Sequence, residues 1–165
     1  MAAAVVVVAL AAFACGDDGD DRDARAVVSP VPTSPSASPT FARTTALLDT
    51  DEGSTLIDVE VAETDAQRQL GLMNRESLPE DAGMVFIWFE EASGPFWMKD
   101  TLIPLSIAFF DLDGKILKIL DMEPCEAEPC ELYDPGVSYR GALEVNQGAF
   151  DEWGVEEGDF IRLNR

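Results

Sequence analysis

The feature that most constrains the fold is an apolar run, Gly94–Phe110, which two prolines divide. Pro95 and Pro104 cannot donate a backbone hydrogen bond, so this run cannot form one continuous central strand. We therefore predict a first strand over Phe96–Lys99, a bend, and a second strand over Leu105–Asp111.

The first of these strands would carry two different faces. Side chains alternate along a strand, so Phe96 and Met98 would point to the core, and Trp97 and Lys99 would point the other way. An amphipathic aromatic ring beside an ammonium group is typical of a binding surface, and we expect a ligand on that second face.

The charge and the histidine count exclude several functions. The 165-residue chain has 32 acidic against 11 basic residues, a formal net charge of -21, and no histidine. Such a surface repels phosphate backbones, so we expect no nucleic-acid partner. Without histidine, Ser-His-Asp catalysis and His-rich zinc sites are excluded, and we expect no metal or cofactor.

The N-terminus resembles an export signal. Residues 1–13 form an uncharged Ala/Val/Leu run, whose helix would span about 20 Å, short of the roughly 30 Å hydrocarbon core of a bilayer. The small residues before Cys15 resemble the lipobox of bacterial lipoproteins. That resemblance implies a signal peptide over residues 1–15, acylation of Cys15, and an exported protein anchored by lipid to the bacterial cell membrane.

The segment after Cys15 has the composition of a flexible tether. An aspartate cluster, Asp17–Asp23, is followed by the Pro/Ser/Thr-rich segment Ser29–Thr40. This composition buries too little apolar surface to offset the entropy of ordering. We predict a disordered linker over residues 16–54.

Residues 55–165 are predicted to form a single β-rich domain. Thr64 and Gln67 have the spacing of a capping box, which starts a helix. Asp113-Gly114 supplies a hairpin turn. Short strands without regular strand–helix alternation favour a mainly β fold, a sandwich or barrel with an antiparallel or mixed sheet, and we expect a monomer. The predicted strands include Thr55–Ala62, Gly83–Phe89, Tyr139–Asn146 and Asp159–Leu163, and the predicted helices are Asp65–Met73, which would bury Ala66, Leu70 and Met73, and Ala149–Trp153.

Two cysteines remain in an exported, lipidated chain. Cys125 and Cys130 would then pair in a disulfide. A metal site with this spacing needs further soft ligands, and the domain has no third cysteine.

Six short sequence motifs lie at Gln69–Arg75, Gly83–Phe86, Phe96–Leu105, Met122–Cys125, Cys130–Tyr133 and Leu143–Gly148. Together they resemble the prokaryotic family known as domain of unknown function 192, over about residues 56–163. The resemblance implies a compact β-rich fold, often in an exported protein. The family has no established activity, so no catalytic residue is carried over from it. Ser106 occupies a position at which the family motif often has aspartate.

Our first functional hypothesis is a module that binds a small ligand or an envelope component. Trp97 offers a stacking face, and cationic and amide groups would hold carboxylates or sugar hydroxyls. Against this, Trp97 can be core packing, and Lys99 can pair with Glu144 as a structural salt bridge. The candidate binding residues are Trp97, Lys99, Arg75, Arg140, Glu144 and Asn146.

The alternatives belong to other classes. A cell-envelope hydrolase would use Glu144 with a second carboxylate, Asp100 or Asp121. A redox role for Cys125 and Cys130 does not match the C-x-x-C spacing. A purely structural or interaction role is the third alternative, so the sequence leaves open whether the protein is an enzyme.

Overall fold

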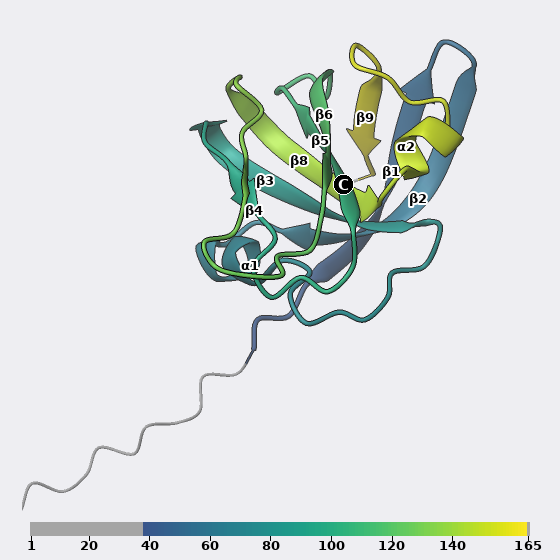
Figure 1. Cartoon of the computed structure of the whole chain (residues 1–165). Helices are drawn as coiled ribbons and strands as arrows, with labels where there is room; N and C mark the ends of the chain where they lie inside the picture. Colours follow the sequence, from purple (N-terminus) through teal and green to yellow (C-terminus); the bar gives the residue numbers. More distant parts are fainter. Residues whose placement is uncertain (1–37, 165) are drawn as a thin grey trace, which may run out of the picture. The chain divides into compact units, whose positions relative to one another are not determined.

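The computed structural model describes residues 38–164, which form one β-rich domain (Figure 1). The predicted fold class, mainly β with two short helices, is confirmed. The elements in chain order are β1 (Ala42–Thr50), β2 (Gly53–Ala62), α1 (Asp65–Leu70), β3 (Ala82–Ala92), β4 (Phe96–Trp97), β5 (Leu105–Phe110), β6 (Ile116–Met122), β7 (Leu132–Tyr133), β8 (Tyr139–Asn146), α2 (Ala149–Glu152) and β9 (Phe160–Leu163).

Seven strands form one curled, mixed sheet in the order β6-β5-β8-β3-β2-β1-β9 (Figure 1). β2 and β3 are parallel, with α1 in the connection between them, and the other neighbours are antiparallel. β4 and β7 form a separate two-stranded sheet. β8 therefore lies inside the main sheet, paired on one side with β3 and on the other with β5.

The two ends of the strand order meet beside the β5–β6 hairpin. The Ile116 amide donates to the Asp159 carbonyl at 2.8 Å, and the Ile161 amide donates to the Gly114 carbonyl at 2.8 Å. Gly114 has a φ of 87°, and a Cβ there would lie 2.2 Å from the Ile161 carbonyl oxygen. A glycine is needed at this position because both the turn and the strand contact exclude a side chain.

The hydrophobic core has two clusters, one on each face of the sheet. The first draws residues from strands at both ends of the strand order, such as Leu48 of β1 and Ile116 of β6, and it includes Phe150 of α2. The second gathers Met84, Leu105 and other residues of the opposite face, against which the segments around α1 and β4 pack. The second cluster is the one that borders the candidate site.

The predicted domain boundary at residue 55 is wrong. Residues 42–54, for which the sequence predicts a disordered linker, form β1, a two-residue turn and the start of β2. Ala46 and Leu48 alternate inward in β1, and this strand pairs with β2 and β9. Two apolar side chains of moderate size are a weak sequence pattern, and the strand is stabilised by neighbours distant in the chain.

The predicted helix Asp65–Met73 ends earlier, at Leu70, and contributes no buried residue. The Thr64–Gln67 capping box is confirmed: Thr64 Oγ1 accepts from the Gln67 amide at 3.3 Å, and Gln67 Oε1 accepts from the Thr64 amide at 3.0 Å. Ala66, expected in the core, is exposed, whereas Leu72 after the helix is buried. One turn and a half of helix is too short to present a continuous apolar stripe.

The predicted signal peptide, Cys15 and most of the predicted linker lie outside the described residues. Within residues 38–164, no helix is both long and apolar enough to cross a membrane.

Candidate functional site

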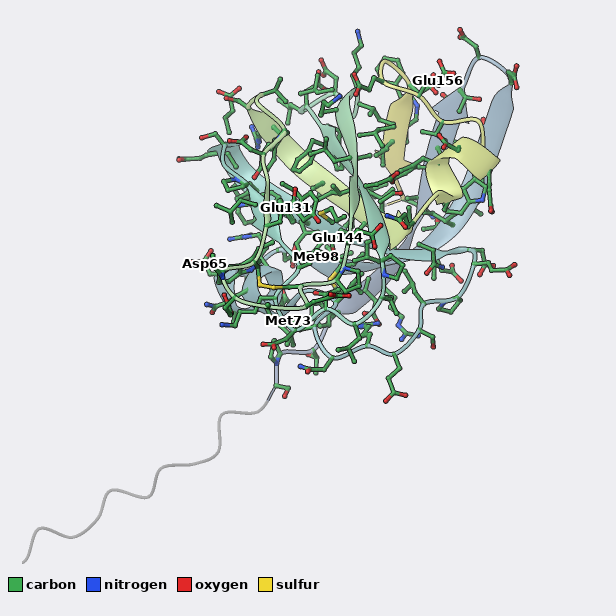
Figure 2. All side chains as sticks on the ribbon, in the orientation of Figure 1. Asp65, Met73, Met98, Glu131, Glu144 and Glu156 are labelled. Carbon is green, nitrogen blue, oxygen red and sulfur yellow. A yellow bond between two sulfur atoms is a disulfide. The ribbon has the colours of Figure 1, made fainter. Side chains whose placement is uncertain are left out.

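Glu144 lies on β8, on the face of the sheet that carries the second core cluster. Its cross-strand neighbours are Met84 on β3 and Ile107 on β5, both fully buried. Glu144 is itself only 5% exposed and is the one buried acidic residue in the part of the chain that the structure describes. Figure 2 shows its side chain within the domain, near Met98 in this view.

The Glu144 carboxyl has no partner among residues 38–164. Burial is the only influence on its pKa, which it raises from 4.5 to about 8, and neither a hydrogen bond nor a positive charge opposes the shift. Every fully enclosed polar side-chain atom of the described domain does have a partner. The unpartnered oxygens of Glu144 must therefore reach open space.

That space is a cavity of about 300 Å³, which we call the Glu144 cavity. It lies between the α1 segment, the middle of β3, the β4 segment and β8. Glu144 is the only carboxyl-bearing residue in its lining, and five of the lining residues are aromatic. The lining consists of Arg68, Gln69, Leu70, Gly71, Leu72, Met73, Phe86, Trp88, Pro95, Phe96, Trp97, Thr101, Tyr139 and Glu144.

The aromatic rings of the cavity support one another. Phe96 meets Phe86 edge-on, with centroids 5.3 Å apart at 90°, and it also meets Trp88 at 6.1 Å. Tyr139 packs against Trp88 at 5.3 Å, and its hydroxyl donates to the Gly94 carbonyl at 3.1 Å. Edge-to-face contacts of this kind hold rings in fixed orientations, so the cavity wall is preorganised.

Arg68 borders the cavity but is already held by other groups. Its guanidinium lies 5.2 Å from the centroid of the Trp88 ring. One of its terminal nitrogens donates to the carbonyls of Glu63 (2.7 Å) and Ile87 (2.8 Å), and the other pairs with Asp65. Arg68 therefore fixes α1 against β3 and is not the counter-ion of Glu144.

The alternation predicted for Phe96–Lys99 is confirmed. Met98 is buried and Phe96 packs against the second core cluster, whereas Trp97 is 48% exposed. The Lys99 ammonium lies 5.8 Å from the centroid of the Trp97 ring. The predicted strand is shorter than expected, because only Phe96 and Trp97 pair with β7.

Lys99 pairs with Glu128, not with Glu144. Its Nζ lies 3.0 Å from a Glu128 carboxylate oxygen. The hydrogen bond and charge of Glu128 raise the pKa of Lys99, and Lys99 lowers the pKa of Glu128 in return. The Lys99–Glu144 salt bridge that we considered as a structural alternative is therefore wrong.

Arg75 lies away from the Glu144 cavity, in an ion-pair cluster at another site. It pairs with Glu60, which also accepts from Arg43 at 2.9 Å. Burial alone would raise the pKa of Glu60, but the hydrogen bonds from Arg75 and Arg43 outweigh it and lower the pKa. This arrangement explains Arg75 as a structural residue that connects the segment after α1 to β2.

Arg140 and Asn146 also bind the protein's own backbone. Arg140 donates to the carbonyls of Trp88 (3.2 Å) and Phe89 (2.5 Å). The Asn146 amide donates to the Leu78 carbonyl at 3.0 Å, which fixes the loop before β3. Neither residue lines the Glu144 cavity. Of the six candidate residues, the structure brings Trp97 and Glu144 to one cavity and places Lys99 beside it.

Most of the cavity wall is not recognisable in the sequence. Phe86 and Trp88 belong to the predicted strand Gly83–Phe89, and nothing in the sequence assigns a role to Tyr139 or Arg68. One signal was present: Met84, Phe86 and Trp88 share a face by alternation. Their approach to Glu144 depends on the register of β3 with β8, in which Met84 lies opposite Glu144.

The predicted disulfide between Cys125 and Cys130 is confirmed, with Cα atoms 5.3 Å apart. Its short loop carries Glu128, the partner of Lys99. The bridge thus restrains the segment that holds Lys99 beside Trp97.

The second carboxylate of the hydrolase hypothesis does not reach the Glu144 cavity. Asp100 and Asp121 are exposed, and neither lines the cavity. Asp121 instead accepts a hydrogen bond from the Ser106 hydroxyl. Ser106 is buried and in turn accepts from the Gly148 amide at 2.9 Å, so it has a structural role between β5 and the start of α2.

Two solved structures are similar to this chain. One is a protein from Sinorhizobium meliloti, described as a candidate transcription regulator, with 31% identity, a TM-score of 0.71, and coverage of 76% of this chain and 96% of that one. The other, of unknown function, is from Novosphingobium aromaticivorans, with 26% identity, a TM-score of 0.66, and coverage of 75% and 93%. No curated protein matches the chain.

A family model also matches residues 47–163, which is most of the chain and nearly all of the described domain. The matched region includes β8 with Glu144 and every residue that lines the Glu144 cavity. The chain therefore belongs to the DUF192 family, which is described as an uncharacterised ACR.

Proposed function

We propose that the domain is a small-ligand binding module and that the Glu144 cavity is its binding site. The observation that carries this proposal is the Glu144 carboxyl, which is 5% exposed, has no partner among residues 38–164, and opens on an aromatic cavity. Burying a polar group without a partner costs roughly 1–3 kcal/mol. A ligand that meets this group would offset the cost, whereas a purely structural role gives no reason for it.

The size and lining of the cavity fit this role. Its volume of about 300 Å³ lies at the lower end of the range for ligand sites. Five of its fourteen lining residues are aromatic, and Thr101 and Glu144 are buried polar residues. Such a composition is usual in ligand sites, because the rings provide contact area and the polar groups fix orientation. Trp97, half-exposed at the edge of the cavity, is available to a ligand on its solvent side.

For the location, we propose an exported protein anchored to the cell membrane through a lipid on Cys15. The Cys125–Cys130 disulfide supports an oxidising, extracytoplasmic environment. The description of the Sinorhizobium protein as a transcription regulator does not suit this chain. A net charge of -21 opposes contact with a phosphate backbone.

A thermal-shift screen of cell-wall and glycan fragments, amino compounds and small alcohols tests the binding function. We expect at least one compound to raise the melting temperature of the wild type, since a ligand that binds only the native state stabilises it by mass action. The shift should shrink in Trp97→Ala and in Glu144→Gln. The matched control is Phe89→Ala, which removes a 78% exposed aromatic outside the Glu144 cavity.

The result that contradicts this proposal is equally definite. If every stabilising compound acts as strongly on Trp97→Ala and Glu144→Gln as on the wild type, the Glu144 cavity is not the binding site. The hydrolase alternative is less well supported, because a two-carboxylate mechanism needs a second acid across the cavity and its lining has none.

A further inference from the structure

The charges around the Glu144 cavity indicate which class of ligand it can bind. The cavity lining has one acidic residue and one basic residue, Arg68. Arg68 is held by Asp65 and by two backbone carbonyls. In the described part of the chain, no lysine or arginine forms an ion pair with Glu144. The Glu144 carboxyl therefore has no positively charged partner among the described residues.

We propose that the Glu144 cavity takes an organic cation, an ammonium or quaternary ammonium group on a small ligand. The cationic group would pair with the Glu144 carboxylate, and its alkyl surface would contact the aromatic wall. This inference rests on the proposed binding function and names the class of ligand.

The aromatic wall supports a cation over a neutral ligand. The face of an aromatic ring attracts positive charge, and tryptophan does so most strongly. Both tryptophans of the cavity already hold cations of the chain itself: Arg68 lies 5.2 Å from the Trp88 centroid and Lys99 lies 5.8 Å from that of Trp97. Phe86, Phe96 and Tyr139 also line the cavity, and no cation of the described domain lies over their rings.

The net charge of the chain also favours a cationic ligand. A net charge of -21 raises the local concentration of cations at the surface and speeds their encounter with a site. At the wall of a cavity, a carboxylate that is 5% exposed gains more from an ion pair than an exposed carboxylate does. An anionic ligand would be repelled by the negative surface and, once Glu144 is ionised, by its carboxylate.

The test is a calorimetric or NMR titration of the whole chain with choline, tetramethylammonium and butylammonium. The matched neutral probe is 3,3-dimethylbutan-1-ol, which has the shape of choline without its charge. Choline is charged at every pH, so any pH dependence of its binding belongs to the protein. Burial, aided by the charge of Asp134, raises the pKa of Tyr139 above 10, so that residue stays neutral.

We expect choline affinity to rise at least tenfold between about pH 6 and about pH 9, because Glu144 ionises in this range. Glu144→Gln should abolish that rise and weaken binding at least tenfold at the higher pH. The exposed control Glu76→Gln should behave as the wild type does. The neutral alcohol should bind more weakly than choline and without pH dependence.

Two further outcomes separate this inference from the function on which it rests. If the neutral alcohol or a glycan binds, Trp97→Ala weakens that binding, and none of the three cations binds, the cavity is a binding site but the cation assignment is wrong. If choline binds equally well to wild type and Glu144→Gln, the assignment is again wrong. If neither the cations nor the screened compounds depend on Trp97 or Glu144, both proposals fail.

Discussion

Glu144 lowers the stability of the folded domain, because its carboxyl is buried without a partner among the described residues, and it is also the central residue of the proposed binding site. Its neighbours across the sheet are apolar, and its carboxyl gains no hydrogen bond from the described residues. Isosteric replacement by glutamine keeps the shape and removes the charge. The energetic consequence of this carboxyl can therefore be measured directly against pH.

The first prediction concerns the free energy of unfolding of Glu144→Gln. In the folded protein Glu144 keeps its proton up to about pH 8, whereas the unfolded chain releases it near 4.5. The stability that the proton provides is therefore fully present below pH 4.5 and is lost as the pH rises through 8. Relative to the wild type, Glu144→Gln should gain up to about 1.4 kcal/mol per pH unit between these values.

Urea denaturation of both proteins from about pH 4 to about pH 9 measures this difference. Effects of the other acidic residues are common to both and cancel. Glu76→Gln, at an exposed position, provides the control and should follow the wild type at every pH. Parallel stability curves for wild type and Glu144→Gln would show that the carboxyl is hydrated or partnered.

At the level of single residues, some contacts can be predicted from the sequence and others cannot. The inward and outward sides of Phe96–Lys99 followed from alternation, and the Thr64–Gln67 cap followed from spacing, because both are local properties. The partners of Arg75, Arg140 and Asn146 were not predictable, since each is a group brought near by sheet register. Composition alone cannot distinguish such a structural contact from a binding residue.

At the scale of elements, the segments that cover the second core cluster set the shape of the Glu144 cavity. β4 is only two residues long and pairs with the equally short β7, which follows the Cys125–Cys130 loop. The salt bridge from Lys99 to Glu128 joins the same two segments. Such short elements add little by themselves, so the disulfide is the main restraint on this edge of the cavity.

The second prediction is that the double variant Cys125→Ser/Cys130→Ser loses about 2 kcal/mol of unfolding free energy, the value expected for so short a loop. Reducing the wild type should cause the same loss, and the double variant should be insensitive to reductant. Chemical denaturation combined with thiol counting checks this. Two reactive thiols in the unreduced wild type, with no change on adding reductant, would contradict it.

The strands show a similar division between what sequence predicts and what it does not. β8 matches its predicted bounds, because a long strand with a strong pattern is visible locally. β1 was missed, because its pattern depends on Ala46 and Leu48 and its stability on pairing with β2 and β9. The cavity was missed for the same reason, since it exists only where α1, β3, β4 and β8 meet.

At the scale of the whole molecule, the proposals concern where the domain works. The chain has a formal net charge of -21, which favours solubility and the approach of cations. The resemblance to a lipobox concerns residues before the described domain, and the tether is expected to hold the cavity clear of the membrane surface.

The third prediction tests this arrangement in cells. Cys15→Ala should move the protein from the membrane fraction to the soluble fraction, because two acyl chains anchor stably and none remain in the variant. Fractionation and blotting of wild type and variant measure it, and Cys125→Ser/Cys130→Ser is the control that should stay in the membrane fraction. Membrane retention of Cys15→Ala would contradict the lipid anchor.

The most direct test of the central claim is the pKa of Glu144 itself, measured by carbon-13 NMR of the side-chain carboxyls, with Glu144→Gln used to assign the signal. In the free protein we predict a midpoint near pH 8, caused by burial without a partner. Saturation with choline should move that midpoint down, because an ion pair favours the carboxylate. A Glu144 carboxyl that titrates near 4.5 in the free protein, with no change on adding any ligand, would contradict the account.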